Sequence, residues 1–322
     1  MKRPKTVRPF DLSRVRTESA RGRRSLVGVE AFGKPLGPGA GLGDFLDALP
    51  RFLGAESLRA LARAVAASRR RGRGVAFAMG GHVVKTGCSP FVVDLMERGL
   101  VTSVALAGST AIHDFEIALL GRTSEDVAEG LPGGAYGMAE ETGAAFAAAA
   151  GEAAVRGSGL GRALGDAIQR GRMPNRRISI LAAAARLGLP ATVHVAVGTD
   201  IVHMHPECDG ADLGEATFTD FRIACSVVAG LSGGVWLNLG SAVVLPEVFL
   251  KAITVARNTG HPVKDLTTGS LDMLRMYRPE TNVVRRPGKT GHAVLGHHEV
   301  LIPILHAMIL RESGAGRRRR AR

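Results

Sequence analysis

The segment VHVAVGTDIVHMHP, residues 193–206, is the stretch that decides the fold. Its apolar, β-branched run ends abruptly at Gly198, and Asp200, His203 and His205 follow. Runs of this kind are typical of strands buried in a parallel sheet. Because ligands of open α/β sheets bind at the carboxyl ends of such strands, we expect these three polar side chains to face a cleft. The alternative is a polar turn whose histidines make local hydrogen bonds.

The same pattern, a short apolar run followed by small or polar residues, recurs along the chain. Five strands are predicted, at residues 74–79, 101–107, 191–197, 235–239 and 263–266. Helices are predicted over residues 44–67 in two pieces separated at Pro50, and over 89–98, 114–120, 139–151, 160–170, 178–187, 218–231, 246–258 and 298–311. Strands that alternate with helices indicate an α/β fold, here a Rossmann-like parallel sheet covered by helices on both faces in a single large domain.

The residues that follow the predicted strands are small or polar in all five cases. They are Gly80-Gly81-His82, Gly108-Ser109-Thr110, Gly198-Thr199-Asp200, Gly240-Ser241-Ala242 and Thr267-Thr268-Gly269. Right-handed crossovers place all the carboxyl ends on one edge of the sheet. Glycines let a ligand approach the backbone there, and hydroxyl groups and helix N-termini suit phosphate. We therefore predict a dinucleotide-type cleft, although the usual G-x-G-x-x-G fingerprint is absent.

The strongly basic charge of the chain is concentrated at its two ends. Of the net charge of +13, residues 1–24 carry +7 and residues 317–322 carry +5, so the body is close to neutral. We expect a basic flexible arm over residues 1–24, one domain over 25–312 and a basic disordered tail over 313–322. Such runs bind polyanions without sequence preference, so no specific nucleic-acid function is predicted.

Cysteine usage and hydropathy place the chain in the cytoplasm. The three cysteines, Cys88, Cys208 and Cys225, show no paired spacing, which fits a reducing compartment. The first 24 residues lack the apolar core of a signal peptide, and no apolar run approaches the length that spans a bilayer. His203, His205 and Cys208 could supply metal ligands, but so short a spacing arises readily by chance, and no metal site is predicted.

Four segments of the chain resemble the deoxyhypusine synthase family, in particular its bacterial deoxyhypusine synthase-like branch. They are residues 108–116, 195–206, 234–251 and 277–287, within a similar region that extends over residues 74–310. The resemblance implies a Rossmann-like fold, a homotetramer with active sites between subunits, and NAD as cofactor. It also implies oxidation of spermidine or a related polyamine, with transfer of an aminobutyl group to an amine acceptor. That acceptor is a protein lysine in deoxyhypusine synthases and a small diamine in related enzymes.

The resemblance also implies roles for individual residues. NAD would be bound by Gly81, Thr86, Gly108, Ser109, Thr199, Asp200, Gly240, Ser241, Thr268 and His297. The ammonium groups of a polyamine need carboxylates, and Asp272, Glu280 and Glu299 are the candidates by position. Lys289, in Gly288-Lys289, aligns with the lysine that forms the imine, and His203 and Asp200 complete the catalytic set. The family has Trp-Gly-Lys at this lysine, and the Trp is absent here. A substrate-binding histidine of the family is likewise replaced within Leu245-Pro246-Glu247.

Two other interpretations stay open. Lys289 lies in a Gly-rich segment that could equally be a surface loop, and Lys85 would then be the next lysine to consider. The chain would in that case be an enzyme of the same fold with a different substrate and no covalent lysine. The third interpretation is a non-catalytic, oligomeric nucleotide-binding protein.

Overall fold

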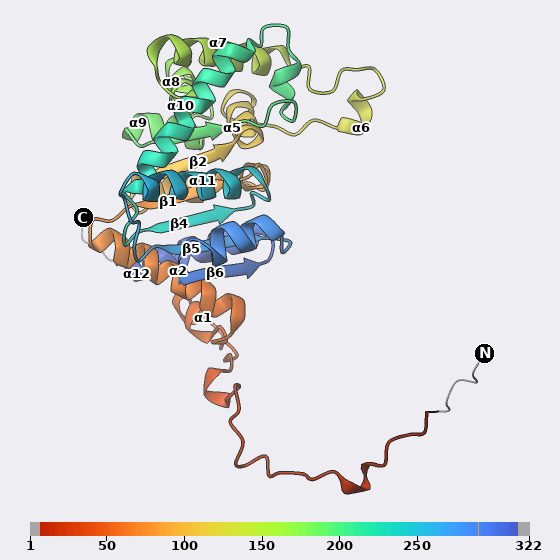
Figure 1. The fold of residues 1–322 in the computed structure, drawn as a ribbon. Helices are drawn as coiled ribbons and strands as arrows, with labels where there is room; N and C mark the ends of the chain where they lie inside the picture. Colours follow the sequence, from red (N-terminus) through yellow and green to blue (C-terminus); the bar gives the residue numbers. More distant parts are fainter. Residues whose placement is uncertain (1–6, 289, 315–322) are drawn as a thin grey trace, which may run out of the picture. The chain divides into compact units, whose positions relative to one another are not determined.

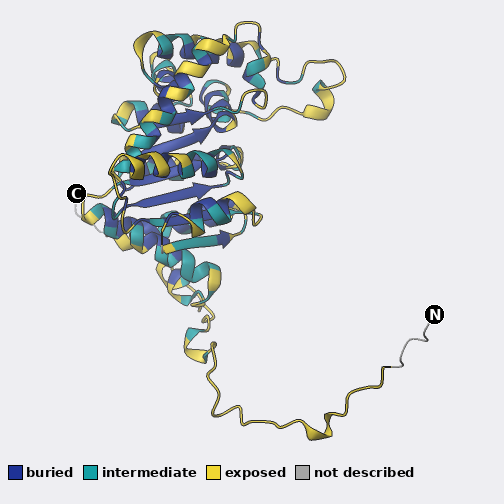
Figure 2. Ribbon diagram, viewed as in Figure 1, coloured by how far each residue is buried: buried dark blue, intermediate teal, exposed yellow. Residues whose placement is uncertain are grey.

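The protein is described by a computed structural model that covers residues 7–288 and 290–314. The chain divides into two units, residues 1–51 and residues 52–322, and each is described by itself. The first unit holds two 3-10 turns, Leu12–Arg14 and Val29–Ala31, and the helix α1, Leu42–Ala48. Most of its described residues are exposed (Figure 2). Its helix ends before Pro50, as proline geometry predicts.

The second unit is built on a six-stranded, fully parallel sheet (Figure 1). The strands are β1 Val75–Met79, β2 Ser103–Ala107, β3 Ala191–His194, β4 Val235–Leu239, β5 Thr267–Asp272 and β6 Thr290–Leu295. Their order is β3-β2-β1-β4-β5-β6. The chain moves outward from β1 to β3 and then returns to the other side of β1 with β4. Ligands of such sheets bind at this switch point, outside the carboxyl ends of β1 and β4.

Helices cover both faces of this sheet. The helices are α2 Leu53–Arg70, α3 His82–Lys85, α4 Ser89–Glu97, α5 Gly108–Leu120, α6 Val127–Gly130, α7 Glu140–Arg156, α8 Leu160–Arg170, α9 Ile180–Leu187, α10 Gly210–Ala229, α11 Val244–Asn258 and α12 His298–Ser313. A 3-10 turn, η3 Ile201–Met204, follows β3, and a π-helical turn, η4 Pro279–Arg285, precedes β6. On one face α2 packs against α12 and the sheet, and on the other α10 packs against α11.

The core beneath α11 is closed by an aromatic pair. Trp236 of β4 stacks on Phe249 of α11, with ring centroids 4.4 Å apart and ring planes 13° apart. Small residues of β1 and β2, among them Ala78 and Ala105, make room for these rings. Trp236 is 1% exposed and belongs to the core, and the Rossmann-like α/β class is confirmed.

The predicted fifth strand was placed too early in the chain. Residues 263–266 form a turn, because Val263 and Asp265 adopt positive φ angles of 45° and 54°. The strand is the polar run from Thr267 to Asp272, and Thr268 is its second residue, 1% exposed. Thr268 therefore lies near the amino end of β5, away from the edge where a cofactor was expected.

Two further differences occur at the edges of the sheet. The strand predicted over residues 191–197 ends at His194, because the Thr217 hydroxyl of α10 donates to Val193 O at 2.9 Å and accepts from Val195 N at 3.3 Å. Strand β6 was not predicted at all. Within the described residues, no helix is long and apolar enough to cross a membrane.

Candidate functional site

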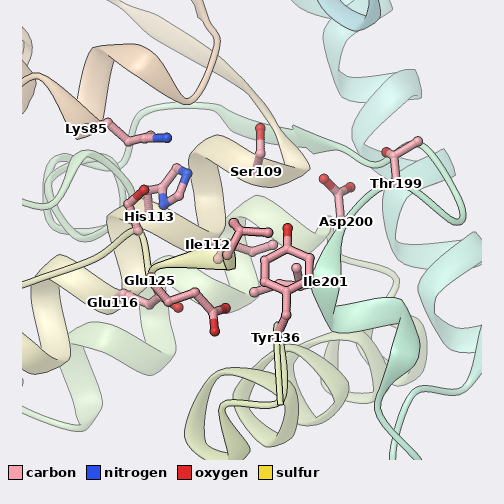
Figure 3. A pocket seen from close by; sticks show the side chains of 12 residues that line it. Lys85, Ser109, Ile112, His113, Glu116, Glu125, Tyr136, Thr199, Asp200 and Ile201 are labelled. Carbon is pink, nitrogen blue, oxygen red and sulfur yellow. The ribbon is translucent and has the colours of Figure 1, made fainter. Parts of the chain in front are cut away.

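A cavity of about 180 Å³ opens at the carboxyl edge of the sheet, beside the ends of β1, β2 and β3 (Figure 3). It is lined by Lys85, Ser109, Ile112, His113, Glu116, Ser124, Glu125, Val127, Tyr136, Thr199, Asp200 and Ile201. Polar and apolar side chains are mixed in this lining, which is the usual character of a small-molecule site.

Four segments bring these side chains together, and one of them, residues 124–136, supplies Ser124, Glu125, Val127 and Tyr136. Helix α5 begins directly after β2, and the spacing of Ser109, His113 and Glu116 puts all three on one helical face. Lys85 ends the short helix that follows β1, and Asp200 follows β3. The predicted convergence of strand ends is therefore seen for the β1, β2 and β3 side of the edge.

His113 is held by a chain of hydrogen bonds that ends on a carboxylate. Its Nδ1 lies 2.7 Å from Thr123 Oγ1, and the Thr123 hydroxyl donates to Glu116. Glu116 also accepts from the Thr142 hydroxyl, at 3.3 Å. Because a hydroxyl has one hydrogen and Thr123 gives it to Glu116, Thr123 must accept from His113 Nδ1–H. The neutral ring therefore keeps its lone pair on Nε2.

The ring is also kept neutral by its surroundings. Burial, followed by the positive charges of Lys85 and His82, lowers the pKa of His113 from 6.5 to about 4. Its outer edge lies over Gly81, where an added Cβ would be 3.1 Å from His113 Cδ2 and 3.4 Å from Ser109 Oγ. The site thus presents an unprotonated imidazole nitrogen beside a serine hydroxyl.

Asp200 is buried against the start of helix α5. A Cβ at Gly108 would collide with Asp200 Oδ2, so the space over Gly108 is filled by this carboxylate. We expected a ligand to use that space, and the packing of Asp200 corrects this expectation. Burial raises the pKa of Asp200, while His203 and backbone hydrogen bonds from Ala196 and Ser109 oppose the rise. Its Oδ2 has no hydrogen-bond partner among the described residues.

The two histidines after β3 do not line this cavity. His203 Nδ1 accepts from Gly198 N at 3.1 Å, and His205 Nε2 lies 2.8 Å from Gly137 O. His205 also packs tightly on Gly143 of α7. The expectation that both would face a cleft is corrected in favour of local hydrogen bonding. Of the proposed catalytic set, Asp200 lines the cavity, His203 lies outside its lining, and Lys289 lies outside the described residues.

The predicted cofactor residues are spread along the edge of the sheet. Gly81, Ser109, Thr199 and Asp200 lie at or in the cavity, and Gly108 lies behind it. Gly240 lies at the switch point, where its carbonyl touches Gly80 so closely that a side chain at Gly80 would clash. Ser241 Oγ accepts from Leu245 N at 3.2 Å, and Thr86 Oγ1 donates to His82 O at 2.7 Å.

The acidic residues predicted to bind substrate lie apart from the cavity. Asp272 and Glu280 line a separate depression of only about 10 Å³. Glu280 pairs with Arg285 at 2.8 Å, and Glu299 faces His297, the remaining predicted cofactor residue, at 3.8 Å. Within one chain these acids lie apart from Asp200, and their assignment to the substrate stays a prediction.

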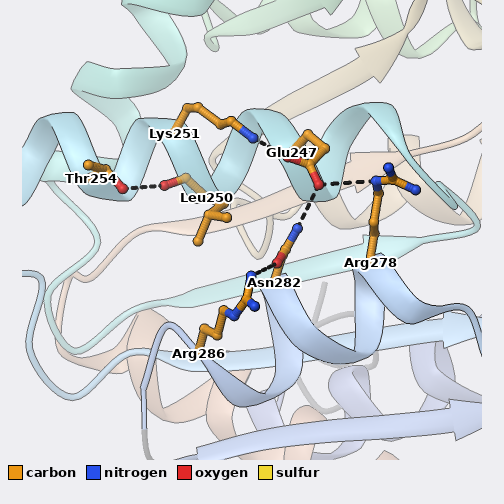
Figure 4. A network of polar contacts seen from close by, with 7 residues as sticks. All are labelled: Glu247, Leu250, Lys251, Thr254, Arg278, Asn282 and Arg286. Atoms are coloured by element: carbon orange, nitrogen blue, oxygen red, sulfur yellow. Dashed lines mark hydrogen bonds and ion pairs between the residues drawn. The ribbon is translucent and has the colours of Figure 1, made fainter.

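A polar network joins α11 to the π-helical turn η4, beside strands β4, β5 and β6 (Figure 4). Glu247 pairs with Lys251 and accepts from Arg278 Nε at 3.2 Å and from Asn282 Nδ2 at 2.8 Å. Arg286 in turn donates to Asn282 Oδ1 at 2.8 Å. Hydrogen bonding to Lys251, above all, lowers the pKa of Glu247. Glu247 therefore serves as a structural link between α11 and η4.

Another acid of α5 supports the fold rather than the site. Asp114, fully buried, accepts from Ser179 Oγ at 2.6 Å, Ile180 N at 2.8 Å and Leu181 N at 3.0 Å, and so caps helix α9. Burial raises its pKa to about 6. Although Asp114 belongs to α5, it therefore stabilises the start of α9.

The sequence interpretation missed several lining residues, chiefly His113, Glu125 and Tyr136. The spacing of Ser109, His113 and Glu116 was a usable signal for one polar helical face. Glu125 and Tyr136 lie in a segment without periodicity and gave no such signal. In residues 7–288 and 290–314, no cluster of three or more His, Cys, Asp or Glu residues could hold a metal ion.

Comparisons with known proteins support the fold. The chain matches no protein-family model and no curated protein. Among solved structures it resembles AgrE in its ternary complex with ornithine and NAD⁺, with TM-score 0.55 and 12% identity over 81% of this chain and 34% of that chain. Unliganded AgrE gives 0.52 and 13%, over 80% and 33%. This chain thus spans about a third of the length of AgrE.

A protein from Entamoeba histolytica, provisionally assigned as a deoxyhypusine synthase, is also similar. It matches with TM-score 0.48 and 10% identity, over 88% of this chain and 96% of that chain, which is too weak a likeness to support an argument. At identities this low the AgrE comparisons show the fold alone. They agree with the Rossmann-like α/β architecture found in residues 52–322.

Proposed function

We propose that this chain is an NAD-dependent enzyme that oxidises a small amine in the cavity between Lys85, His113 and Asp200. One observation carries the proposal: the cavity presents an unprotonated imidazole nitrogen and a partly unsatisfied carboxylate at the carboxyl edge of a Rossmann-like sheet. Both groups accept hydrogen bonds, which is what an amine requires. The likeness to AgrE, which was solved with NAD⁺ and ornithine, supports the choice of cofactor.

The residues at the switch point fit a dinucleotide. Gly81 leaves a space bounded by His113 and Ser109 that a side chain would fill, whereas the space over Gly240 is taken by the ring of His298. Close approach of a ligand to the backbone requires a glycine such as Gly81. NAD, when bound, would supply the acceptor for the hydride of the amine carbon.

The side chains of the cavity would prepare the amine for oxidation. An ammonium must lose a proton before its carbon can give up hydride, and His113 Nε2 is placed to hold that proton. Thr123 and Glu116 fix the ring, because their hydrogen bonds allow one tautomer. Asp200 would orient the amine from the other side, and Tyr136 and Ile112 would limit access of water.

The family resemblance extends the proposal to spermidine or a related polyamine and to aminobutyl transfer within a homotetramer. That extension depends on Lys289, because transfer through an imine needs a lysine in the site. The acceptor of the aminobutyl group would be a protein lysine or a small diamine, and the cavity residues do not specify which. We therefore propose amine oxidation as the function of the cavity, and aminobutyl transfer as its form if Lys289 reaches it.

The test is direct. The full-length protein, incubated with NAD⁺ and either spermidine or an amino acid such as ornithine, should form NADH with at least one of them, and mass spectrometry should detect diaminopropane from spermidine if the transfer half-reaction operates. Asp200→Asn should abolish NADH formation, whereas Asp166→Asn, which removes an exposed partner of Arg162, should not. Absence of NAD binding in calorimetry at millimolar cofactor would rule the proposal out.

A further inference from the structure

We propose that the ligand of the cavity carries a carboxylate next to its amine, so that it is an α-amino acid rather than a polyamine, with Lys85 and Ser109 holding the carboxylate. This inference deepens the proposed function and rests on it for the identity of the reacting group, the amine. Its own evidence is the state of the charged groups that line the cavity.

The carboxylates of the cavity already have partners within the protein. Glu116 accepts from Thr123 and Thr142, and Glu125 accepts from Gly137 N at 2.9 Å. Asp200 is met by backbone amides and by the charge of His203, and only its Oδ2 is left without a partner among the described residues. The acids are therefore held in place before any ligand arrives.

Lys85 is in the opposite state. In the part of the chain that the structure describes, its ammonium makes neither a hydrogen bond nor an ion pair, and it stands at the exposed rim of the cavity. It is also the one cation in the lining, since the other charged lining residues are the three acids. A ligand with only amines would leave Lys85 unpaired and would be repelled by it, whereas a ligand carboxylate would pair with it.

The neighbours of Lys85 match the shape of an α-amino acid. Lys85 and His113 line the same cavity, and His113 and Ser109 meet over Gly81. Figure 3 shows the Lys85 amine, the His113 ring and the Ser109 hydroxyl on the same side of the cavity. An α-amino acid bears its carboxylate and its nitrogen on one carbon. The carboxylate would thus lie on Lys85 and Ser109 while the nitrogen donates to His113 Nε2.

Pairing at Lys85 would also improve His113 as a base. A ligand carboxylate cancels one of the positive charges that disfavour the imidazolium. The ammonium then gives one proton to Nε2 and becomes a neutral amine. The imidazolium keeps its Nδ1–H bond to Thr123, which charge strengthens. A polyamine offers no group that could do this.

The experiment compares two ligands that differ only in the carboxylate. Ornithine and putrescine are titrated calorimetrically into the full-length protein, with and without NAD⁺. We expect ornithine to bind at least about tenfold more tightly, the difference that one charged hydrogen bond supplies. Lys85→Met should remove that preference. Lys251→Met, whose lysine pairs with Glu247 on α11, is the matched control and should keep it.

Each other outcome contradicts the inference. Putrescine binding as tightly as ornithine, or no binding of ornithine to folded protein, would overturn it. So would a Lys85→Met variant that loses affinity for NAD⁺ alone while the ornithine preference survives, because Lys85 would then serve a phosphate of the dinucleotide. Failure of the proposed function is distinguishable: ornithine would bind with the expected preference, but neither amine would yield NADH.

Discussion

The two halves of the sheet's carboxyl edge have similar sequences after their strands, but only one of them forms a sizeable cavity. On the β1–β2–β3 half, Gly108-Ser109-Thr110 opens onto a cavity of about 180 Å³. On the β4–β5–β6 half, Gly240-Ser241-Ala242 is followed by the Glu247 network, and the depression there measures about 10 Å³. Small and polar residues after a strand therefore do not by themselves make a site. A site arises where polar groups are left facing space instead of one another.

The largest expected effect on stability distinguishes Asp114, an acid that supports the fold, from Glu116, an acid of the cavity on the same helix. Asp114→Ala removes the acceptor of one hydroxyl and two amides at the start of α9, so we expect a loss of about 3 kcal/mol or more in the free energy of unfolding. Glu116→Gln, two residues on, keeps an acceptor for Thr123 and should cost far less. Urea denaturation measures both. Equal losses would mean that the two faces of α5 do not differ in role.

A glycine substitution tests how closely the cavity half is packed. Gly108→Ala places a Cβ against Asp200, so the carboxylate must move, and we expect a loss of about 1–3 kcal/mol together with weaker ornithine binding. Gly214→Ala in α10 is the control, because nothing lies within 4 Å of its added Cβ, and it should be neutral or stabilising. If Gly108→Ala is as stable as Gly214→Ala, the Asp200 carboxylate can move away from Gly108 without cost, which would contradict the close packing expected here.

The pH dependence of stability should report His113. Its pKa in the folded state is about 4, below the ordinary value of 6.5, so between these values the unfolded chain binds the proton more readily. The stability tied to neutral His113 is complete above pH ~6.5 and is lost as the pH falls towards 4. The wild type should therefore lose more stability on acidification than His113→Gln.

This comparison of variants is needed because two buried acids act in the opposite sense. The pKa of Asp114 is raised to about 6 and that of Asp220 to about 7, both by burial, so their contributions fall as the pH rises. Chemical denaturation at several pH values gives the difference between wild type and variant directly. Parallel curves would contradict a neutral, buried His113.

The smallest effect is expected on the β4–β5–β6 half. Glu247→Gln weakens exposed ion pairs to Lys251 and Arg278, and such pairs contribute about 0–1 kcal/mol. Thermal unfolding should show a small shift, and ligand binding in the cavity should be unchanged. A marked loss of binding would mean that the second half of the edge belongs to the site after all.

The sequence predicted what depends on local periodicity. Strands β1, β2 and β4 and helices α4, α8 and α11 were placed within a few residues, and the convergence of Ser109, Thr199 and Asp200 followed from strand alternation. Strand β5 was misplaced because the apolar residues Val263 and Leu266 belong to a turn, while the buried strand itself is largely polar.

What could not be predicted depends on contacts between distant residues. His113 is fixed through Thr123 and Glu116, and the last link, Thr142, comes from a different helix. No spacing rule marks such a relay. Asp272 and Glu280 were predicted to bind the substrate, and within one chain they lie at a separate depression, where Glu280 pairs with Arg285. Predictions for Lys289, for the tails and for the oligomer stay predictions.

The carboxylate of Asp200 over Gly108 has a consequence for ligand exchange. It occupies the start of α5, a position where helices in such sheets attract ligand anions. The Asp200 carboxylate thus takes the place of a ligand anion, and a phosphate could bind at the start of α5 only by displacing it. This competition depends on pH, because a protonated, uncharged Asp200 is held there less strongly than the carboxylate. Two other glycines of this edge are occupied in the same way, Gly80 by the carbonyl of Gly240 and Gly240 by the ring of His298, so a ligand has to displace a protein group at each of these positions.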